Sequence, residues 1–158
     1  MGFHLLGLAV SVIILLPNLF FFLLPPRNMP ELENKEPMIL TVLENTGRFA
    51  CFLYPIVFGR DIAALQASAI LCVMAACTVL YYFCWARYFL GGREFSLLFK
   101  PLWSLPVPMA VFPAVYFLSL TILLRSILMG AAAILFAFSH ISISFMTWRQ
   151  IKEKGRDQ

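Results

Sequence analysis

The sequence has few charged residues. Lys, Arg, Asp and Glu together make up 13% of its 158 residues, against roughly a quarter in ordinary soluble domains. Hydrophobic residues make up 61%, and the mean hydropathy is +0.86. So little charge cannot cover the surface of a water-soluble domain. The composition therefore predicts an integral membrane protein that folds as one domain over residues 1–158, with the lipid bilayer as its main partner.

Motifs for metals, cofactors and known catalytic centres are also missing. All four cysteines lie in apolar segments, and Cys72 and Cys77 have the wrong spacing for a zinc ribbon or a thioredoxin-like pair. We therefore predict no metal and no cofactor, while the sequence leaves open whether the protein is an enzyme. No Lys or Arg precedes the first apolar run, so we expect that run to be a retained span and not a cleaved signal peptide.

Apolar runs that are long enough to cross a bilayer recur along the chain. A transmembrane helix needs about 20 apolar residues. The sequence predicts spans at about 3–24, 38–58, 62–85, 102–124 and 126–148. The predicted fold class is all-α, a polytopic membrane bundle of five transmembrane helices with a polar tail at 149–158. Prolines crowd the fourth span, so either its helix begins near Pro108 or it is broken near the edge of the bilayer.

The distribution of Lys and Arg predicts the orientation of this bundle. With five spans, nine Lys and Arg residues fall on one side of the membrane, and Arg60 and Arg125 fall on the other. The positive-inside rule then places the N-terminus outside and the C-terminus in the cytoplasm. Trp85, Trp103 and Trp148 lie at the predicted cytoplasmic ends, where tryptophan commonly anchors helices. The net charge of +4 is explained by this orientation and by anionic lipids, so we predict no nucleic-acid partner.

The second predicted span carries charge inside its apolar run. Thr41, Glu44, Asn45 and Arg48 follow the i, i+3, i+4, i+7 spacing of one helix face. A charge that faces lipid near the bilayer centre costs about 2.5 to 3.5 kcal/mol. We therefore expect this polar stripe to face the interior of the bundle.

Two further polar residues are predicted at the same depth. Asn18 in the first span and His140 in the fifth fall in the same layer as Glu44 and Arg48 when each helix is counted at about 1.5 Å per residue. His140 belongs to a face of small and polar residues, which favours close helix contact. This face consists of Ser126, Gly130, Ala133, Ala137, His140, Ser144 and Thr147.

Two stretches resemble a known family. Residues 43–48, Leu-Glu-Asn-Thr-Gly-Arg, and residues 139–144, Ser-His-Ile-Ser-Ile-Ser, resemble a family of small uncharacterised multi-pass membrane proteins of Gram-positive bacteria. The resemblance implies a location in the bacterial cell membrane and assigns no catalytic residue.

Three functions fit the polar layer. The first is a small binding or transport protein with a pocket on the cytoplasmic side, in which Arg48 receives an anionic or lipidic ligand. The candidate ligand-binding or proton-relay residues are Glu44, Arg48, His140, Asn45 and Asn18. The second is a membrane enzyme for a lipidic substrate, with Glu44 and His140 as acid and base, and the third is a structural or accessory subunit.

A purely structural role for the layer stays open. Glu44 precedes Arg48 by four residues, the favourable order for an ion pair within one helix, so the layer could be a clamp that fixes helix register. In a further alternative, Glu44 lies at the membrane surface. Five spans cannot form two equal repeats, so alternating access by paired repeats would require a homo-oligomer.

Overall fold

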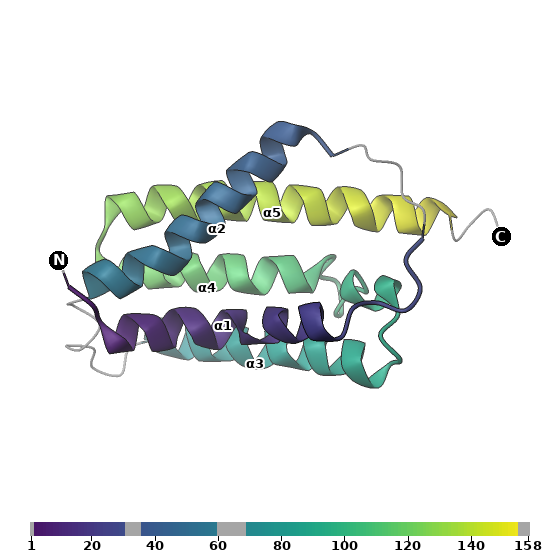
Figure 1. Ribbon diagram of the computed structural model, residues 1–158, viewed down its shortest axis with the longest axis horizontal. Helices are drawn as coiled ribbons and strands as arrows, with labels where there is room; N and C mark the ends of the chain where they lie inside the picture. Colours follow the sequence, from purple (N-terminus) through teal and green to yellow (C-terminus); the bar gives the residue numbers. More distant parts are fainter. Residues whose placement is uncertain (1, 31–35, 60–68, 155–158) are drawn as a thin grey trace.

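The structure is a computed structural model that describes residues 2–30, 36–59 and 69–154 (Figure 1). Within these residues the chain is all-helical, and no strand forms. The helices are α1 (Leu5–Leu23), α2 (Met38–Phe58), α3 (Ala69–Leu90), the 3-10 helix η2 (Phe95–Leu98), α4 (Pro108–Leu124) and α5 (Ile127–Lys154). The predicted all-α class is therefore confirmed.

Helix ends agree with the prediction for α2, lie within two residues of it for α1, and differ by more at one end or both for the other three α-helices. In the fourth predicted span, 102–124, the helix begins at Pro108, as one of the two predicted alternatives had it. Proline fits the first turn of a helix, and Val107 before it is left-handed, with φ 45°. Helix α3 continues past 85 to Leu90, and α5 continues past 148 to Lys154. The predicted polar tail is thus helical through Lys154, while residues 62–68 of the third predicted span and the last four residues lie outside the described part.

Three of the described helices are long and apolar enough to cross a bilayer, namely α1, α3 and α5. This is compatible with a membrane location. Helix α4 is apolar but has only 17 residues. Helix α2 has 21 residues, and its mean hydropathy is lowered by Glu44, Asn45 and Arg48.

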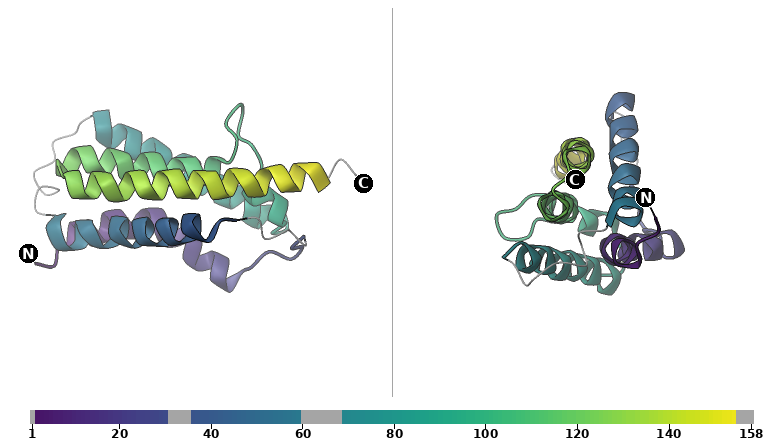
Figure 2. Two further views of the ribbon diagram at one scale, coloured as in Figure 1. Left: turned by 90° about the horizontal axis from the view of Figure 1, so that it is seen from above. Right: turned by 90° about the vertical axis from the view of Figure 1, so that its left-hand side faces the viewer.

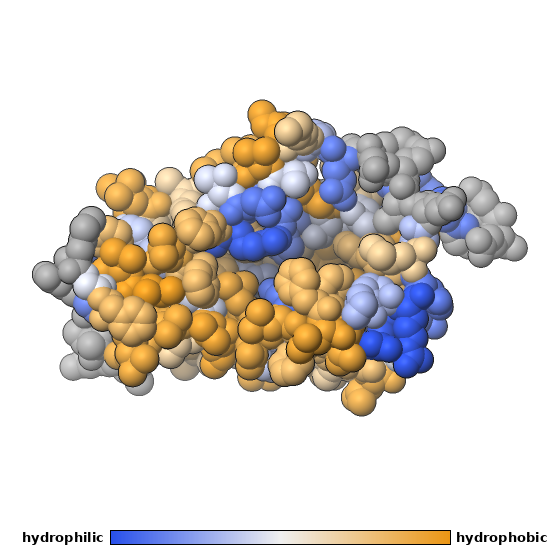
Figure 3. All heavy atoms as spheres, viewed as in Figure 1, coloured by the Kyte–Doolittle hydropathy of each residue, from blue (hydrophilic) through white to orange (hydrophobic). Residues whose placement is uncertain are grey.

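Successive helices run in opposite directions along the long axis of the molecule (Figures 1 and 2). Helix α5 packs against α2 and α4, α4 packs against α3, and α1 lies against α2 and α3. The fully buried side chains between them include Ile14, Tyr88, Phe117 and Met129. The surface is apolar as well, and hydrophobic residues cover most of the face in Figure 3.

Helices α1 and α2 touch closely at one end and diverge toward the other (Figure 1). A β-carbon on Gly7 would overlap the carbonyl oxygen of Pro55, so only glycine allows this approach. One turn further along α1, the hydroxyl of Ser11 donates a hydrogen bond to the carbonyl oxygen of Phe52 at 3.1 Å. Beyond this contact α2 crosses toward α5 and leaves α1.

The contact between α2 and α5 is centred on Gly47. A β-carbon at this position would lie 2.7 Å from the backbone nitrogen of Phe136. Because the two helices are antiparallel, the residue one turn before Gly47 meets the residue one turn after Phe136. Those two residues are Glu44 and His140. None of the predicted small and polar residues of the α5 face is fully exposed, which confirms that this face points inward.

Candidate functional site

Glu44 is the centre of a cluster that joins α2 to α5. Its side chain is only 11% exposed. The carboxylate oxygen Oε1 accepts a hydrogen bond from Nη2 of Arg48, one turn later on α2. The same oxygen lies 2.8 Å from Nδ1 of His140 on α5. We call these three residues the Glu44 cluster.

The imidazole of His140 is held in one orientation. An ionised carboxylate only accepts hydrogen bonds, so Nδ1 carries the proton and donates it to Glu44. The ring also stacks on Phe136, with 4.9 Å between the centroids and 16° between the planes. A neutral His140 therefore presents Nε2 as an acceptor, and a protonated His140 presents it as a donor.

Arg48 contacts the carboxylate of Glu44 through Nη2. Its side chain is 44% exposed, and a guanidinium has five N–H donors. Arg48 also lines a cavity of about 620 Å³, which is in the range of small-molecule sites. We call it the apolar cavity, because most of its lining consists of aliphatic and aromatic side chains. All five α-helices contribute to that lining.

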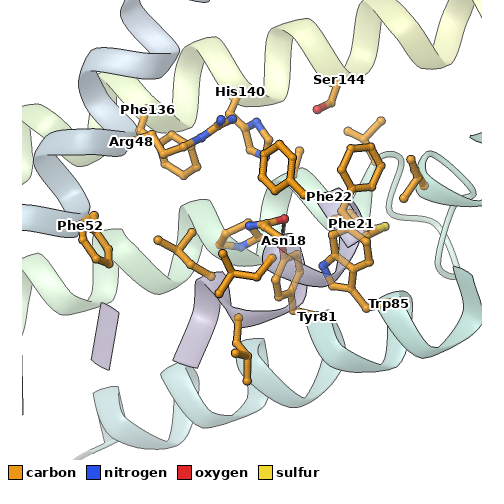
Figure 4. A pocket seen from close by; sticks show the side chains of 18 of the residues that line it. Asn18, Phe21, Phe22, Arg48, Phe52, Tyr81, Trp85, Phe136, His140 and Ser144 are labelled. Atoms are coloured by element: carbon orange, nitrogen blue, oxygen red, sulfur yellow. Dashed lines mark hydrogen bonds between the residues drawn. The ribbon is translucent and has the colours of Figure 1, made fainter. Parts of the chain in front are cut away.

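Few polar side chains reach the apolar cavity. They are Asn18, Arg48, Tyr81, His140 and Ser144. In Figure 4, Arg48 and His140 approach from one side, and Asn18 and Tyr81 approach from the other. The hydroxyl of Tyr81 donates to Oδ1 of Asn18 at 3.1 Å, which leaves the amide N–H groups of Asn18 available as donors. The polar groups thus face a common space between the helices.

A second cavity, of about 430 Å³, lies on the other side of His140. It is more polar, and we call it the polar vestibule. Its polar lining consists of Glu36, Glu44, His140, Ser144, Thr147 and Gln150. Within it, the hydroxyl of Thr147 donates to Oε1 of Glu36 at 3.2 Å. His140, Ser144 and Phe99 line both cavities, so these three side chains form the partition between them.

The structure brings together four of the five predicted site residues. Glu44, Arg48 and His140 are in direct contact, and Asn18 faces Arg48 and His140 across the apolar cavity. The fifth, Asn45, is exposed on α2 and does not line either cavity. Thr41 is exposed in the same way.

The outward position of Asn45 follows from the buried face of α2. That face runs through Glu44, Gly47, Cys51 and Pro55, at spacings of three and four residues. Arg48 flanks this face and is half-buried. Asn45 lies on the same side of this face as Arg48 but further round the helix, where the side chain is exposed. The polar stripe predicted from spacing thus overlaps the buried face of α2 at Glu44, while the centre of that face lies on the Gly47 side of Glu44.

Sequence reasoning missed the roles of Tyr81, Trp85 and Thr147. Trp85 was predicted to anchor a helix at the membrane surface, whereas it is buried and lines the apolar cavity. Tyr81, Trp85 and Tyr88 follow one another at spacings of four and three, and all three are buried. This spacing places the three aromatic residues on one face of α3, and it is the sequence pattern that could have predicted their burial.

No group of three or more His, Cys, Asp and Glu side chains that could hold a metal ion occurs in the described residues. Compared with models of known protein families, with curated proteins and with solved structures, the chain shows no match in any of the three. The resemblance of residues 43–48 and 139–144 to a family of Gram-positive membrane proteins therefore stays a prediction.

Proposed function

We propose that the chain is a multi-pass protein of the cell membrane in which all five α-helices cross the bilayer. Two features of the molecule support this proposal. Successive helices are antiparallel, so their connections alternate between two ends of the bundle (Figure 1). Large hydrophobic side chains are also exposed on every helix, as Phe22, Phe49, Val79, Ile122 and Phe138 illustrate. Lipid is the solvent in which such a surface is stable.

We further propose that the N-terminus lies outside and the C-terminus in the cytoplasm. The described basic residues at the end of the bundle where α5 finishes are Arg27, Arg87, Arg93, Lys100, Arg149, Lys152 and Lys154. At the opposite end the described basic residue is Arg125. This asymmetry follows the positive-inside rule.

The activity that the cavity supports best is the binding of an amphipathic anion, meaning a hydrocarbon chain that carries a carboxylate, phosphate or sulfonate. The observation that carries this proposal is a half-exposed guanidinium, that of Arg48, in the wall of a mostly apolar cavity. Arginine suits carboxylate and phosphate because its planar fork matches their geometry. The aromatic and aliphatic lining suits the hydrocarbon chain, at about 0.8 kcal/mol for each buried methylene group.

The opening of the cavity favours a ligand that arrives from the bilayer. Val12, Leu16 and Leu19 of α1 belong to the lining of the cavity. These side chains are partly or largely exposed on the apolar surface. Figure 3 shows hydrophilic residues in the middle of this apolar face, beside a hollow. A lipid-like anion can therefore approach Arg48 sideways without leaving the hydrocarbon region.

Thermal stability in a non-ionic detergent tests the proposal. We would compare decanesulfonate with decanol, which has the same chain without the charge, and with inorganic sulfate, which has charge without the chain. Decanesulfonate should raise the Tm, because a ligand that binds only the folded state stabilises it. The two controls should raise it much less. A shift from decanol equal to that from decanesulfonate would show that charge is not recognised and would overturn the proposal.

Two arginine variants test whether the stabilisation by decanesulfonate arises from binding in the apolar cavity. Arg48→Gln should abolish the stabilisation by decanesulfonate. Arg149→Gln removes an exposed guanidinium on α5 that does not line the cavity, so it should keep the stabilisation. If both variants respond like the wild type, Arg48 is not the anion-binding group.

A membrane enzyme for a lipidic substrate is the second candidate function. It is favoured by the hydrogen bond from Nδ1 of His140 to Glu44, which orients an imidazole toward the apolar cavity as general acid–base catalysis requires. Incubation of the reconstituted protein with radiolabelled bacterial lipids, followed by chromatography, tests it. Conversion of a lipid by the wild type but not by His140→Gln would support it, and no conversion would count against it.

A further inference from the structure

His140 lines both the apolar cavity and the polar vestibule, so its charge affects both. On one side is the apolar cavity with Arg48, and on the other is the polar vestibule with Glu36 and Glu44. The charged groups that face His140 from α2 and the segment before it are Glu36, Glu44 and Arg48. On α3, the titratable side chain of Tyr81 faces His140 across the apolar cavity. The lining residues from α1 and α4 are uncharged.

With a neutral His140, the charge of the Glu44 cluster is balanced when no ligand is bound. The carboxylate of Glu44 carries one negative charge, the guanidinium of Arg48 carries one positive charge, and a neutral His140 carries none. A bound anion that pairs with Arg48 would leave the cluster with one uncompensated negative charge. In a water-poor cavity such a charge is strongly unfavourable.

One proton restores the balance at the place where the anion binds. Protonated His140 keeps its Nδ1–H bond to Glu44 and gains an Nε2–H donor. Because His140 and Arg48 both line the apolar cavity, the anion then has a cationic partner on two helices. The ion pair between Glu44 and Arg48 can loosen at the same time, since the carboxylate keeps the protonated imidazole as its partner.

The polar vestibule supplies a route for this proton. It contains Gln150 and Thr147 on α5 and Glu36 before α2, and Thr147 donates to Glu36 at 3.2 Å. Ser144 lies one turn from His140 and lines both cavities. Side chains that can donate and accept hydrogen bonds thus extend along α5 from Gln150 to His140.

We propose that the binding of the anion is coupled to the uptake of one proton, which reaches the pair of Glu44 and His140 through the polar vestibule. This inference rests on the proposed function, because it concerns the same site and ligand. The proton comes from hydronium or a buffer acid at the vestibule end. Its bond to that donor breaks as the Nε2–H bond of His140 forms, the proton stays on the pair until the anion leaves, and no redox step occurs. The site would therefore take up its ligand as a neutral combination of anion and proton.

Calorimetric titration with decanesulfonate tests the coupling, because a sulfonate keeps its charge across the pH range used. Titrations in two buffers with different heats of ionisation give the number of protons taken up on binding. We expect close to one proton per sulfonate over part of the range between pH 6 and pH 9. Over that part the affinity should fall by up to tenfold for each unit of rising pH, since proton uptake accompanies binding.

Variants distinguish failure of the coupling from failure of the proposed function. His140→Gln and Glu44→Gln should each reduce the proton uptake and flatten the dependence of affinity on pH. His4→Gln, which removes the other histidine of the chain at the far end of α1, should change neither. Wild-type protein that binds decanesulfonate without proton uptake would overturn the coupling and leave the proposed function standing. Absence of binding would overturn both.

Discussion

Replacing Glu44 with glutamine tests whether the Glu44 cluster is a working site or a structural clamp. The substitution keeps the shape of the side chain and removes its charge. The glutamine carbonyl can still accept the hydrogen bond from Nδ1 of His140, and Arg48 is 44% exposed, so neither partner is left fully buried and unpaired. What is lost is the charge-assisted part of these bonds, about 1–2 kcal/mol.

Arg48→Gln acts on the other side of the same pair. It leaves the carboxylate of Glu44, which is 11% exposed, with His140 as its described partner. The expected loss is again about 1–2 kcal/mol, because the cavity beside Arg48 already lets solvent or ligand reach the cluster. At about 2–4 °C for each kcal/mol in a chain of this size, either single substitution should lower the Tm by roughly 2–8 °C.

Thermal unfolding of the wild type, the two single variants and the double variant, all in the same lipid nanodiscs, measures these effects as a double-mutant cycle. Glu153→Gln, an exposed carboxylate on α5, is the control for removal of a charge, and its Tm should stay that of the wild type. Losses of 3 kcal/mol or more for each single variant, with recovery in the double variant, are the behaviour of a buried pair held for stability. That result would refute the interpretation of the cluster as a binding site.

The remaining predictions concern packing, access and orientation. Gly47→Ala should destabilise the protein by about 1–3 kcal/mol in thermal unfolding, because its β-carbon would press on Phe136; Gly2→Ala, with nothing within 4 Å of the new methyl group, should not. Leu19→Trp at the cavity opening should weaken decanesulfonate binding in calorimetry, whereas Ile13→Trp, equally on α1 but outside the cavity lining, should leave it unchanged. A green fluorescent protein fused to the C-terminus should fluoresce and an alkaline phosphatase fusion should be inactive; the reverse would contradict the proposed orientation.

The contacts among Glu44, Arg48 and His140 follow from local patterns in the sequence. Glu44 and Arg48 are one helical turn apart, so their ion pair follows from helix geometry once the segment is helical. Their meeting with His140 required only antiparallel helices of similar length and the small-residue face of α5. These properties depend on the spacing of residues within a helix and on the number of residues from each helix end, and both can be read from the sequence.

Properties that depend on contacts between distant segments were not predictable in the same way. The centre of the buried face of α2 is set by the fit of Gly47 against Phe136, and that fit turns Asn45 outward. The burial of Trp85 depends on the extension of α3 to Leu90 and on its packing against Phe21 of α1. Spacing within one helix does not reveal which of two adjacent faces a neighbouring helix will cover.

The apolar cavity itself arises from a difference between the two ends of α1. At one end the absence of a side chain at Gly7 lets the backbones of α1 and α2 come into direct contact, so the two helices lie close together. Toward the other end α2 follows α5 instead, because Gly47 allows a close approach to the backbone of Phe136. Since α2 cannot lie against both helices along its whole length, a space remains beside Arg48. Two glycines on different helices thus determine where a ligand can enter.

Glu44 gives this space a property that Arg48 alone would not have. An arginine without a counter-ion in an apolar cavity would hold any anionic lipid tightly and release it slowly. In the proposed function, the carboxylate of Glu44 would compete with the ligand for the guanidinium that it holds in the free protein. Protonation of His140 would favour the ligand, because it compensates the charge of the anion. On this proposal, an internal competitor one helical turn from the binding group makes the exchange of an anion reversible.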